Sequence, residues 1–132
     1  MSADADNRQV VREAFRPWEQ GDPGPFFDLV ADDVHWTVIG TSPLSGVFQS
    51  KQALFDHSFN RLLDRLDGPL TTTLVDVSAD GDKVFLQFES TGASTTGVDY
   101  HQVYCFAMTM RQHRIVEVIA YLDTGLLSAV MA

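Results

Sequence analysis

The segment Tyr100–Thr124 constrains the fold more than any other part of this chain. Two runs rich in β-branched and aromatic residues, Tyr100–Met110 and Ile115–Thr124, flank the four polar residues Arg111–Arg114. Such residues favour strands, and two strand-like runs joined by a short polar segment are typical of a hairpin. The segment therefore predicts a long antiparallel hairpin that the rest of the chain covers or extends.

The start of the chain has the periodicity of an amphipathic helix over residues 6–20. Its apolar face would consist of Val10, Val11, Ala14, Phe15 and Trp18. Pro17 lacks an amide donor and predicts a kinked last turn, and Gly21 predicts the end of the helix. Polar side chains before the first turn predict N-terminal capping. These are Asp4, Asp6 and Asn7.

A second helix and a short strand are predicted next. Asp22–Pro25 has an acceptor followed by prolines, which predicts the start of a short apolar helix that ends at Asp32 and Asp33. Alternating polarity over Val34–Ile39 then predicts a strand. One face of this strand would carry Val34, Trp36 and Val38.

A third helix follows the turn-rich connection Gly40–Gly46. Ser50 is a favoured N-cap residue, and Lys51–Leu66 keeps helical spacing of its apolar residues. Gly68 and Pro69 predict that the helix stops before them.

After the third helix the period changes from helical to extended. Thr71–Ser78 and Lys83–Thr91 predict two strands joined by a tight turn over Ala79–Asp82. Gly92–Gly97 predicts a loop before the hairpin, and the apolar tail Gly125–Ala132 is expected to pack on the body or on a neighbouring subunit. Three helices followed by a meander of strands predict one α+β domain spanning residues 1–132.

The bulk properties exclude several classes of partner. Eighteen acidic against nine basic residues give a net charge of −9, which lacks the basic footprint that nucleic acids and anionic membranes require. The single cysteine, Cys105, excludes an intrachain disulfide and suits a reducing compartment. No apolar run approaches the ~18 residues needed to span a bilayer. The sequence predicts a soluble cytoplasmic protein.

The histidines give one candidate for acid–base chemistry and no metal site. His35, His57 and His113 lie far apart in sequence, with no spacing typical of metal ligands. His101 alternates with three small side chains, which would leave room for a ligand beneath that face of the strand. These are Val103, Cys105 and Ala107. The alternative is a histidine that is hydrogen-bonded within a packed sheet.

Two carboxylates and two tryptophans complete the candidates. Glu89 and Asp123 lie near strand ends in apolar sequence, and burial would raise their pKa enough for proton transfer. Asp123 precedes Thr124-Gly125, so a turn or capping role is the alternative for its carboxylate. Trp18 and Trp36 could line an apolar pocket or belong to the core.

Short motifs in a fixed order extend the reading across nearly the whole chain. The front half carries Trp18–Asp22, Ala31–Trp36 and Pro43–Gly46. The back half carries Glu89, Gly97–Tyr100, Tyr104–Phe106, Arg114–Glu117 and Tyr121–Leu127. Together they resemble the NTF2-like superfamily, and within it the SnoaL-like and ketosteroid-isomerase-like group.

The resemblance implies a cone-shaped α+β domain. In such domains a strongly curved, mainly antiparallel sheet wraps around three N-terminal helices and leaves a deep apolar cavity, and two copies commonly pair through the outer sheet face. The superfamily includes isomerases, polyketide cyclases, epoxide hydrolases and binding domains without catalysis, so the fold alone does not select the function.

The catalytic positions implied by the resemblance carry other residues here. The general-base aspartate of ketosteroid isomerases falls at Val38, and their oxyanion-binding tyrosine and aspartic acid fall at Ala14 and Cys105. The last-strand aspartate of the cyclases and epoxide hydrolases falls at Ala120, and the Arg-x-Asp pair of the hydrolases has no counterpart around Glu89. Because proton abstraction requires a base and aligned donors, these mechanisms cannot operate unchanged.

Three functions follow as hypotheses, none with a cofactor or metal. The first is a domain that binds a small, largely apolar ligand. Its cavity would be lined by Trp18, Trp36, Val38, His101, Cys105, Val118, Ala120 and Leu122. The second is an isomerase or polyketide-cyclase-type enzyme with relocated acid–base residues, His101, Asp123 or Glu89. The third is a dimeric module that binds partners through its outer sheet face. That face would carry Tyr100, Tyr104, Phe106 and Met108.

Overall fold

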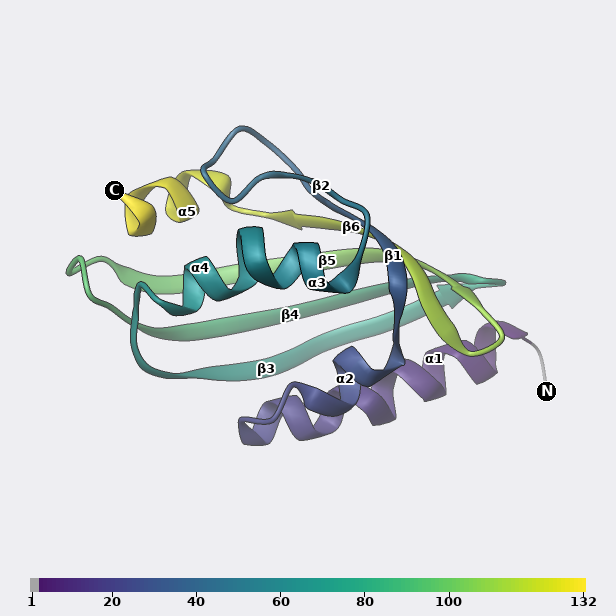
Figure 1. The fold of residues 1–132 in the computed structure, drawn as a ribbon. Helices are drawn as coiled ribbons and strands as arrows, with labels where there is room; N and C mark the ends of the chain where they lie inside the picture. The colour runs from purple at the N-terminus through teal and green to yellow at the C-terminus, as the bar shows by residue number, and fades with distance from the viewer. Residues whose placement is uncertain (1–2) are drawn as a thin grey trace.

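A computed structural model describes residues 3–132 as a curved six-stranded sheet with helices packed against one face (Figure 1). We call the helix-covered face the inner face and the opposite one the outer face. The strands are β1 (Val30–Val38), β2 (Gly46–Phe48), β3 (Leu66–Asp80), β4 (Lys83–Ser94), β5 (Asp99–Arg111) and β6 (Arg114–Leu122). Their order is β2-β1-β6-β5-β4-β3, and every pair is antiparallel except β1–β6. The predicted α+β class with a mainly antiparallel sheet is confirmed.

The predicted hairpin forms the middle of this sheet. β5 and β6 pair from Tyr104 opposite Leu122 to Arg111 opposite Arg114. The turn between them is Gln112-His113, and both residues have positive φ (50° and 62°). A two-residue hairpin turn of type I′ requires positive φ at both of these positions.

The helices cover the inner face in four segments, one more than predicted. Their parts are α1 (Ala3–Phe15), the 3-10 turn η1 (Arg16–Gln20), α2 (Gly24–Leu29), α3 (Lys51–Leu54), the π-helical turn η2 (Phe55–Phe59), α4 (Asn60–Leu63) and α5 (Thr124–Met131). α3, η2 and α4 form one continuous segment, which lies across the sheet in Figure 1. The unpredicted helix is α5. Its Leu127 and Val130 are buried, so the apolar tail packs on the body.

Several predicted helix signals are found, with shifts at the ends. Pro17 lies in the first turn of η1, where a backbone N–H has no partner within the helix and a proline is therefore tolerated. Gly21 ends η1 with a φ of 93°, and the Ser50 hydroxyl accepts from the Ala53 amide at 3.0 Å. The capping predicted for Asn7 is wrong: α1 already begins at Ala3, and the Asn7 amide donates to the Gly81 carbonyl at 3.0 Å.

The other two predicted caps differ in status. Asp6 also lies inside α1, so it does not cap the helix. The side chain of Asp4 lies outside the described residues.

The strands are longer than their sequence patterns predict. β1 begins at Val30, because the backbone there already pairs with Ile115 of β6. β3 begins at Leu66, so Gly68 and Pro69 lie within a strand instead of a loop. β3 is an edge strand, and a proline without an amide donor is tolerated there. β4 continues to Ser94, which shortens the predicted loop.

Candidate functional site

A cavity of about 430 Å³ lies between the helices and the inner face of the sheet. Its sheet wall is formed by Trp36, Val38, Phe88, Tyr104, Phe106, Ala120 and Leu122. Its opposite wall comes from α3, η2 and α4, with Leu54, Ser58, Phe59, Leu62 and Leu63. Leu127 of α5 also lines it. The cavity is therefore mainly apolar, as small-molecule sites usually are.

The opening of the cavity is marked by lining residues that are exposed. These residues are Gly21, Leu63, Gly68 and Pro69. Leu70 also lines this region, and it packs closely over Gly92 of β4. A Cβ atom on Gly92 would lie 2.8 Å from Leu70 Cδ2, so a larger residue at this position would require the Leu70 side chain to move.

The helix wall contains a π-helical turn, which places Ser58 and Phe59 toward the cavity. Single π-helical turns inside α-helices are frequently found at functional sites. The Ser58 hydroxyl donates to the Leu44 carbonyl at 2.9 Å, so its proton is already used within the wall.

Aromatic rings form much of the cavity wall. Trp18 packs against Phe27 and Phe88 with ring centroids 5.5 and 5.3 Å apart, and Trp36 lies edge-on to Phe106 at 5.1 Å. Phe88 stacks on Tyr104 at 4.6 Å with an interplanar angle of 10°. Both tryptophans of the chain line the cavity, so their fluorescence should respond to a molecule that enters it.

Two tyrosines of β5 supply the principal polar group. The hydroxyls of Tyr100 and Tyr104 are hydrogen-bonded to each other, and Tyr104 lines the cavity whereas Tyr100 is 1% exposed. Burial raises the pKa of Tyr100 to about 12 and that of Tyr104 well above its usual range. Both phenols are therefore protonated at neutral pH, and Tyr104 can act as a neutral hydrogen-bond partner for a ligand.

Gln102 fixes this part of β5 to the start of α5. Its side-chain oxygen accepts from the Asp123 amide at 2.8 Å, and its side-chain nitrogen donates to the Asp123 carbonyl at 3.0 Å. The Gln102 side chain is fully buried. A second polar pair lies on the neighbouring strands, where the Thr72 and Ser90 hydroxyls are 2.9 Å apart and both residues line the cavity.

The structure places five of the eight predicted lining residues at the cavity: Trp18, Trp36, Val38, Ala120 and Leu122. Val118 faces the interior but is fully buried and does not line the cavity. The placement of His101 and Cys105 in the cavity is wrong. Both point to the outer face, because the larger side chains Tyr104 and Phe106 fill the inner face of β5.

The proposed acid–base residues lie elsewhere. His101 Nε2 is 2.9 Å from Glu89 Oε1 on the outer face, where their side chains are 63% and 40% exposed. The Asp123 carboxylate accepts from the Leu126 amide at 3.2 Å and caps α5, which was the alternative interpretation. None of the three lines the cavity.

The prediction for the outer face is also wrong, by one residue along β5. The residues predicted there, Tyr100, Tyr104, Phe106 and Met108, point inward. The outer face instead exposes Phe85 (40%), Val103 (56%) and Tyr121 (46%). The same shift affects the family comparison, because Cys105 points outward and its inward-facing neighbours are Tyr104 and Phe106.

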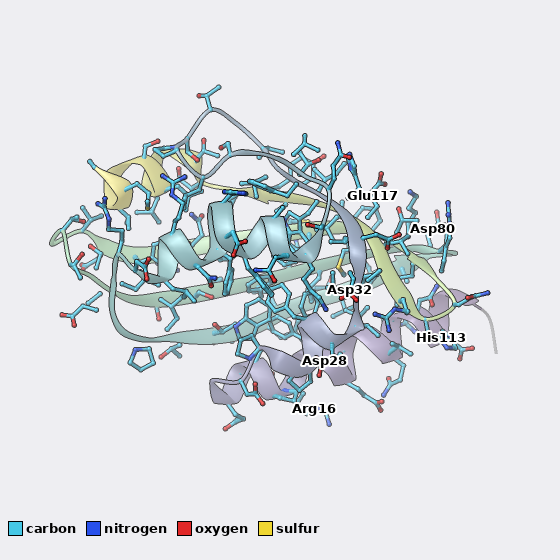
Figure 2. The ribbon with its side chains drawn as sticks, viewed as in Figure 1. Arg16, Asp28, Asp32, Asp80, His113 and Glu117 are labelled. Atoms are coloured by element: carbon cyan, nitrogen blue, oxygen red, sulfur yellow. The ribbon has the colours of Figure 1, made fainter. Side chains whose placement is uncertain are left out.

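Sequence reasoning missed three polar residues that line the cavity, Thr72, Ser90 and Tyr104, and the buried Gln102 on the same strand face as Tyr104. The spacing Tyr100-x-Gln102-x-Tyr104 places three hydrogen-bonding side chains on one strand face, and this pattern could have indicated them. Figure 2 labels six exposed polar residues, such as Asp32, His113 and Glu117, and none of the six lines the cavity. Within residues 3–132, no cluster of His, Cys, Asp and Glu could hold a metal ion. Nor is any helix in that range long and apolar enough to cross a membrane.

Comparison with known proteins agrees with this architecture. Bal32a, from a soil-derived mobile gene cassette, has a TM-score of 0.82 and 18% identity, covering 99% of this chain and 100% of its own. An NTF2-like protein from Burkholderia thailandensis has a TM-score of 0.79 and 23% identity, covering 96% and 97%. A candidate SnoaL-like polyketide cyclase from Jannaschia has a TM-score of 0.75 and 15% identity. The match covers 100% of this chain and 96% of the cyclase chain. The fold is therefore that of the NTF2-like proteins.

The sequence itself specifies the family within this fold. The profile of the SnoaL-like domain matches residues 11–118, which is most of the chain. The chain therefore belongs to the SnoaL-like domain family. No curated protein sequence matches it significantly.

Proposed function

We propose that this chain, as one SnoaL-like domain over residues 1–132, binds a small, largely apolar molecule in its cavity. The observation that carries the proposal is the cavity of about 430 Å³, whose lining is aliphatic and aromatic apart from a few hydroxyl groups. Removing apolar surface from water on such a wall favours binding by about 25 cal/mol per Å². The lining includes no carboxylate, imidazole or ammonium group.

The experiment that tests this proposal compares two alanines on opposite faces of the hairpin. Ala120 lines the cavity, and Ala107 lies on the outer face next to Ile119. Titration with naphthalene, followed by the emission of Trp18 and Trp36, should give saturable binding to the unmodified chain. Ala120→Phe would fill part of the cavity and weaken binding at least tenfold, whereas Ala107→Phe should retain it. Equal affinities in the two variants would contradict the proposal.

The alternative function is an isomerase or polyketide-cyclase-type reaction. It required His101, Asp123 or Glu89 to act on a cavity-bound substrate, and these side chains lie on the outer face or at the α5 cap. The phenols that do face the interior have a raised pKa, so they are poor bases near neutral pH. The geometry therefore favours binding over proton abstraction by the predicted residues.

We also propose that two copies of the chain pair through the outer face. Thr37, Ile119, Ala107 and Phe85 lie side by side across four strands. The next polar row, Glu117, Thr109 and Lys83, borders this stripe. An apolar stripe with a polar border on a sheet face is the arrangement expected of an isologous interface.

Light scattering tests this pairing. The particle formed by the unmodified chain in solution should have twice the mass of one chain, which is 14.6 kDa. Phe85→Glu should shift it to the mass of one chain, and Thr71→Glu, also exposed on the sheet, should leave the mass unchanged. A monomeric unmodified chain at all concentrations would refute the pairing.

The free thiol of Cys105 further supports the proposal of a reducing, cytoplasmic location.

A further inference from the structure

Five of the aromatic rings that line the cavity form a closed cycle. Its members, taken in order, are Trp18, Phe27, Trp36, Phe106 and Phe88. Neighbouring ring centroids along this cycle are 5.5, 6.1, 5.1 and 5.0 Å apart, and Phe88 returns to Trp18 at 5.3 Å. We call these five residues the aromatic cage.

The aromatic cage is assembled by the fold, because each ring comes from a different element. The elements are η1 for Trp18, α2 for Phe27, β1 for Trp36, β5 for Phe106 and β4 for Phe88. A sixth ring, that of Phe26, is fully buried and does not line the cavity. Its centroid lies 5.4 Å from that of Trp18 and 5.3 Å from that of Phe27, so it supports the cage from behind.

The dimensions of the aromatic cage suit a cation. A regular pentagon with sides of about 5.4 Å, the mean spacing of these centroids, has its centre about 4.6 Å from each corner. The face of an aromatic ring attracts a cation within ~6 Å of its centroid, and tryptophan does so most strongly. A cation at the centre would therefore lie within range of all five rings, two of which are tryptophans.

The charges around the cavity also favour a cation over an anion. Of the described residues, no lysine, arginine or histidine lines the cavity. Arg61 and Arg65 follow or precede lining residues in sequence, and both guanidinium groups donate to backbone carbonyls. The net charge of −9 gives the whole chain a field that attracts cations. No carboxylate lines the described cavity, so the ring faces supply the local negative potential.

The kind of cation follows from the hydrogen bonds that the aromatic cage cannot make. Indole N–H groups are donors only, and the other three rings are phenyl groups, so the cage offers no acceptor. A primary ammonium carries three N–H donors, and leaving them unpaired in an apolar site is costly. A quaternary ammonium has no N–H donor and presents methyl groups to the rings. The cage therefore suits a quaternary ammonium better than a primary one.

We propose that the aromatic cage binds the quaternary ammonium group of a small cation whose remainder is apolar. The remainder of the molecule would occupy the aliphatic part of the cavity, between the sheet and the segment α3–η2–α4. This inference rests on the proposed binding function and deepens it, because it specifies the chemical class of the ligand and the side chains that recognise its charge.

The first test compares two probes of the same shape. Phenyltrimethylammonium carries the charge, and tert-butylbenzene is its neutral isostere. Isothermal titration calorimetry should show that the unmodified chain binds the cation at least as tightly as the hydrocarbon, although the hydrocarbon gains more from leaving water. Weaker binding of the cation than of the hydrocarbon would refute the inference.

The second test changes the electrons of the aromatic cage and keeps its shape. The chain has two tryptophans, and both belong to the cage, so biosynthetic replacement of tryptophan by ring-fluorinated tryptophan modifies no other site. Fluorine withdraws electron density from the ring face and weakens its attraction for a cation. Trifluorination should weaken phenyltrimethylammonium about tenfold and monofluorination less, and tert-butylbenzene should be unaffected.

A matched pair of substitutions gives a third measurement. Trp18→Leu keeps an apolar side chain at the cage and removes one ring, so it should weaken phenyltrimethylammonium about tenfold and tert-butylbenzene less than about threefold. Tyr121→Leu removes an aromatic ring on the outer face and should change neither affinity. Binding of tert-butylbenzene to each variant verifies that the cavity has folded.

The outcomes distinguish this inference from the function on which it rests. If neither probe binds the unmodified chain, the proposed function fails, and the inference fails with it. If tert-butylbenzene binds and phenyltrimethylammonium does not, the binding function stands and the inference is refuted. If fluorination weakens both probes equally or neither of them, the binding function again stands, and the recognition of charge by the aromatic cage is refuted.

Discussion

The two faces of β5 differ more than any two neighbouring regions of this molecule. Tyr100, Gln102 and Tyr104 point inward, where the two tyrosine hydroxyls bond to each other and Gln102 bonds to the backbone of Asp123. His101 and Val103 alternate with them and point outward, where His101 pairs with Glu89 and remains exposed. Residues that are adjacent in sequence therefore face opposite environments. Matched substitutions on the two faces should separate the energetic role of the cavity wall from that of the outer surface.

The largest difference is expected for two phenylalanines of β4. Phe88 is 1% exposed and packs on Tyr104, Phe106 and Trp18, whereas Phe85 is 40% exposed on the outer face. Phe88→Ala should lower the free energy of unfolding by about 3–5 kcal/mol, because it removes buried apolar surface and enlarges the cavity. Phe85→Ala, measured at concentrations where the chain is monomeric, should cost less than about 1 kcal/mol. Urea denaturation measures both, and equal losses would contradict the assignment of the faces.

The next comparison uses two adjacent residues of β5. Gln102→Leu should lower the free energy of unfolding by about 2–3 kcal/mol, since the backbone N–H and carbonyl of Asp123 both lose their side-chain partner. His101→Leu removes only an exposed pair and should cost less than about 1 kcal/mol. Hydrogen exchange should also show weaker protection of α5 in Gln102→Leu alone. Unchanged protection there would show that Gln102 does not hold the helix.

An alkaline titration tests the buried tyrosines. Because burial raises the pKa of Tyr100 to about 12, the folded chain keeps a proton that the unfolded chain loses near pH 10. Stability is therefore unaffected below pH 10 and falls as pH rises from 10 to 12, by at most about 1.4 kcal/mol per pH unit for this group. Denaturation at successive pH values should show a shallower fall in Tyr100→Phe. An unchanged slope in that variant would contradict the raised pKa.

The smallest difference is expected for the hydroxyls of β4. Ser90→Ala removes the partner of Thr72 and should lower the free energy of unfolding by about 1 kcal/mol. Thr91→Ala, at the next and exposed position, should change it by less than about 0.5 kcal/mol. Thermal denaturation measures both variants. A larger loss in Thr91→Ala would show that this hydroxyl pair contributes little.

The sequence predicted the class of fold because local and long-range signals agree. The hairpin, the Ser50 cap and the end of η1 at Gly21 each depend on residues close in sequence. The start of β1 at Val30 depends instead on pairing with Ile115, a residue 85 positions away. The strand over Gly68 and Pro69 likewise requires an edge position that local propensity does not reveal.

The candidate site was predictable only where one face of a strand is clearly apolar. On β6 the residues Ala120 and Leu122 line the cavity, and their alternation with outward-facing residues placed them on one face. β5 carries apolar residues on both faces, so alternation shows which residues share a face and not which face is inside. Small side chains such as Cys105 were expected to leave room for a ligand. The structure instead creates the room between the helices and a wall of large rings, including Tyr104 and Phe106.

Gly92 has a consequence for how such a cavity changes its ligand over evolutionary time. The atom that a new Cβ would displace is the end of the Leu70 side chain, which can rotate away without moving the backbone. A single substitution at this position could therefore reshape the passage into the cavity while the hydrophobic interior stays intact. A substitution of Gly92 would thus change the position of the Leu70 side chain with little effect on the stability of the domain. The size of the admitted molecule can diversify among related chains without a search for a new core.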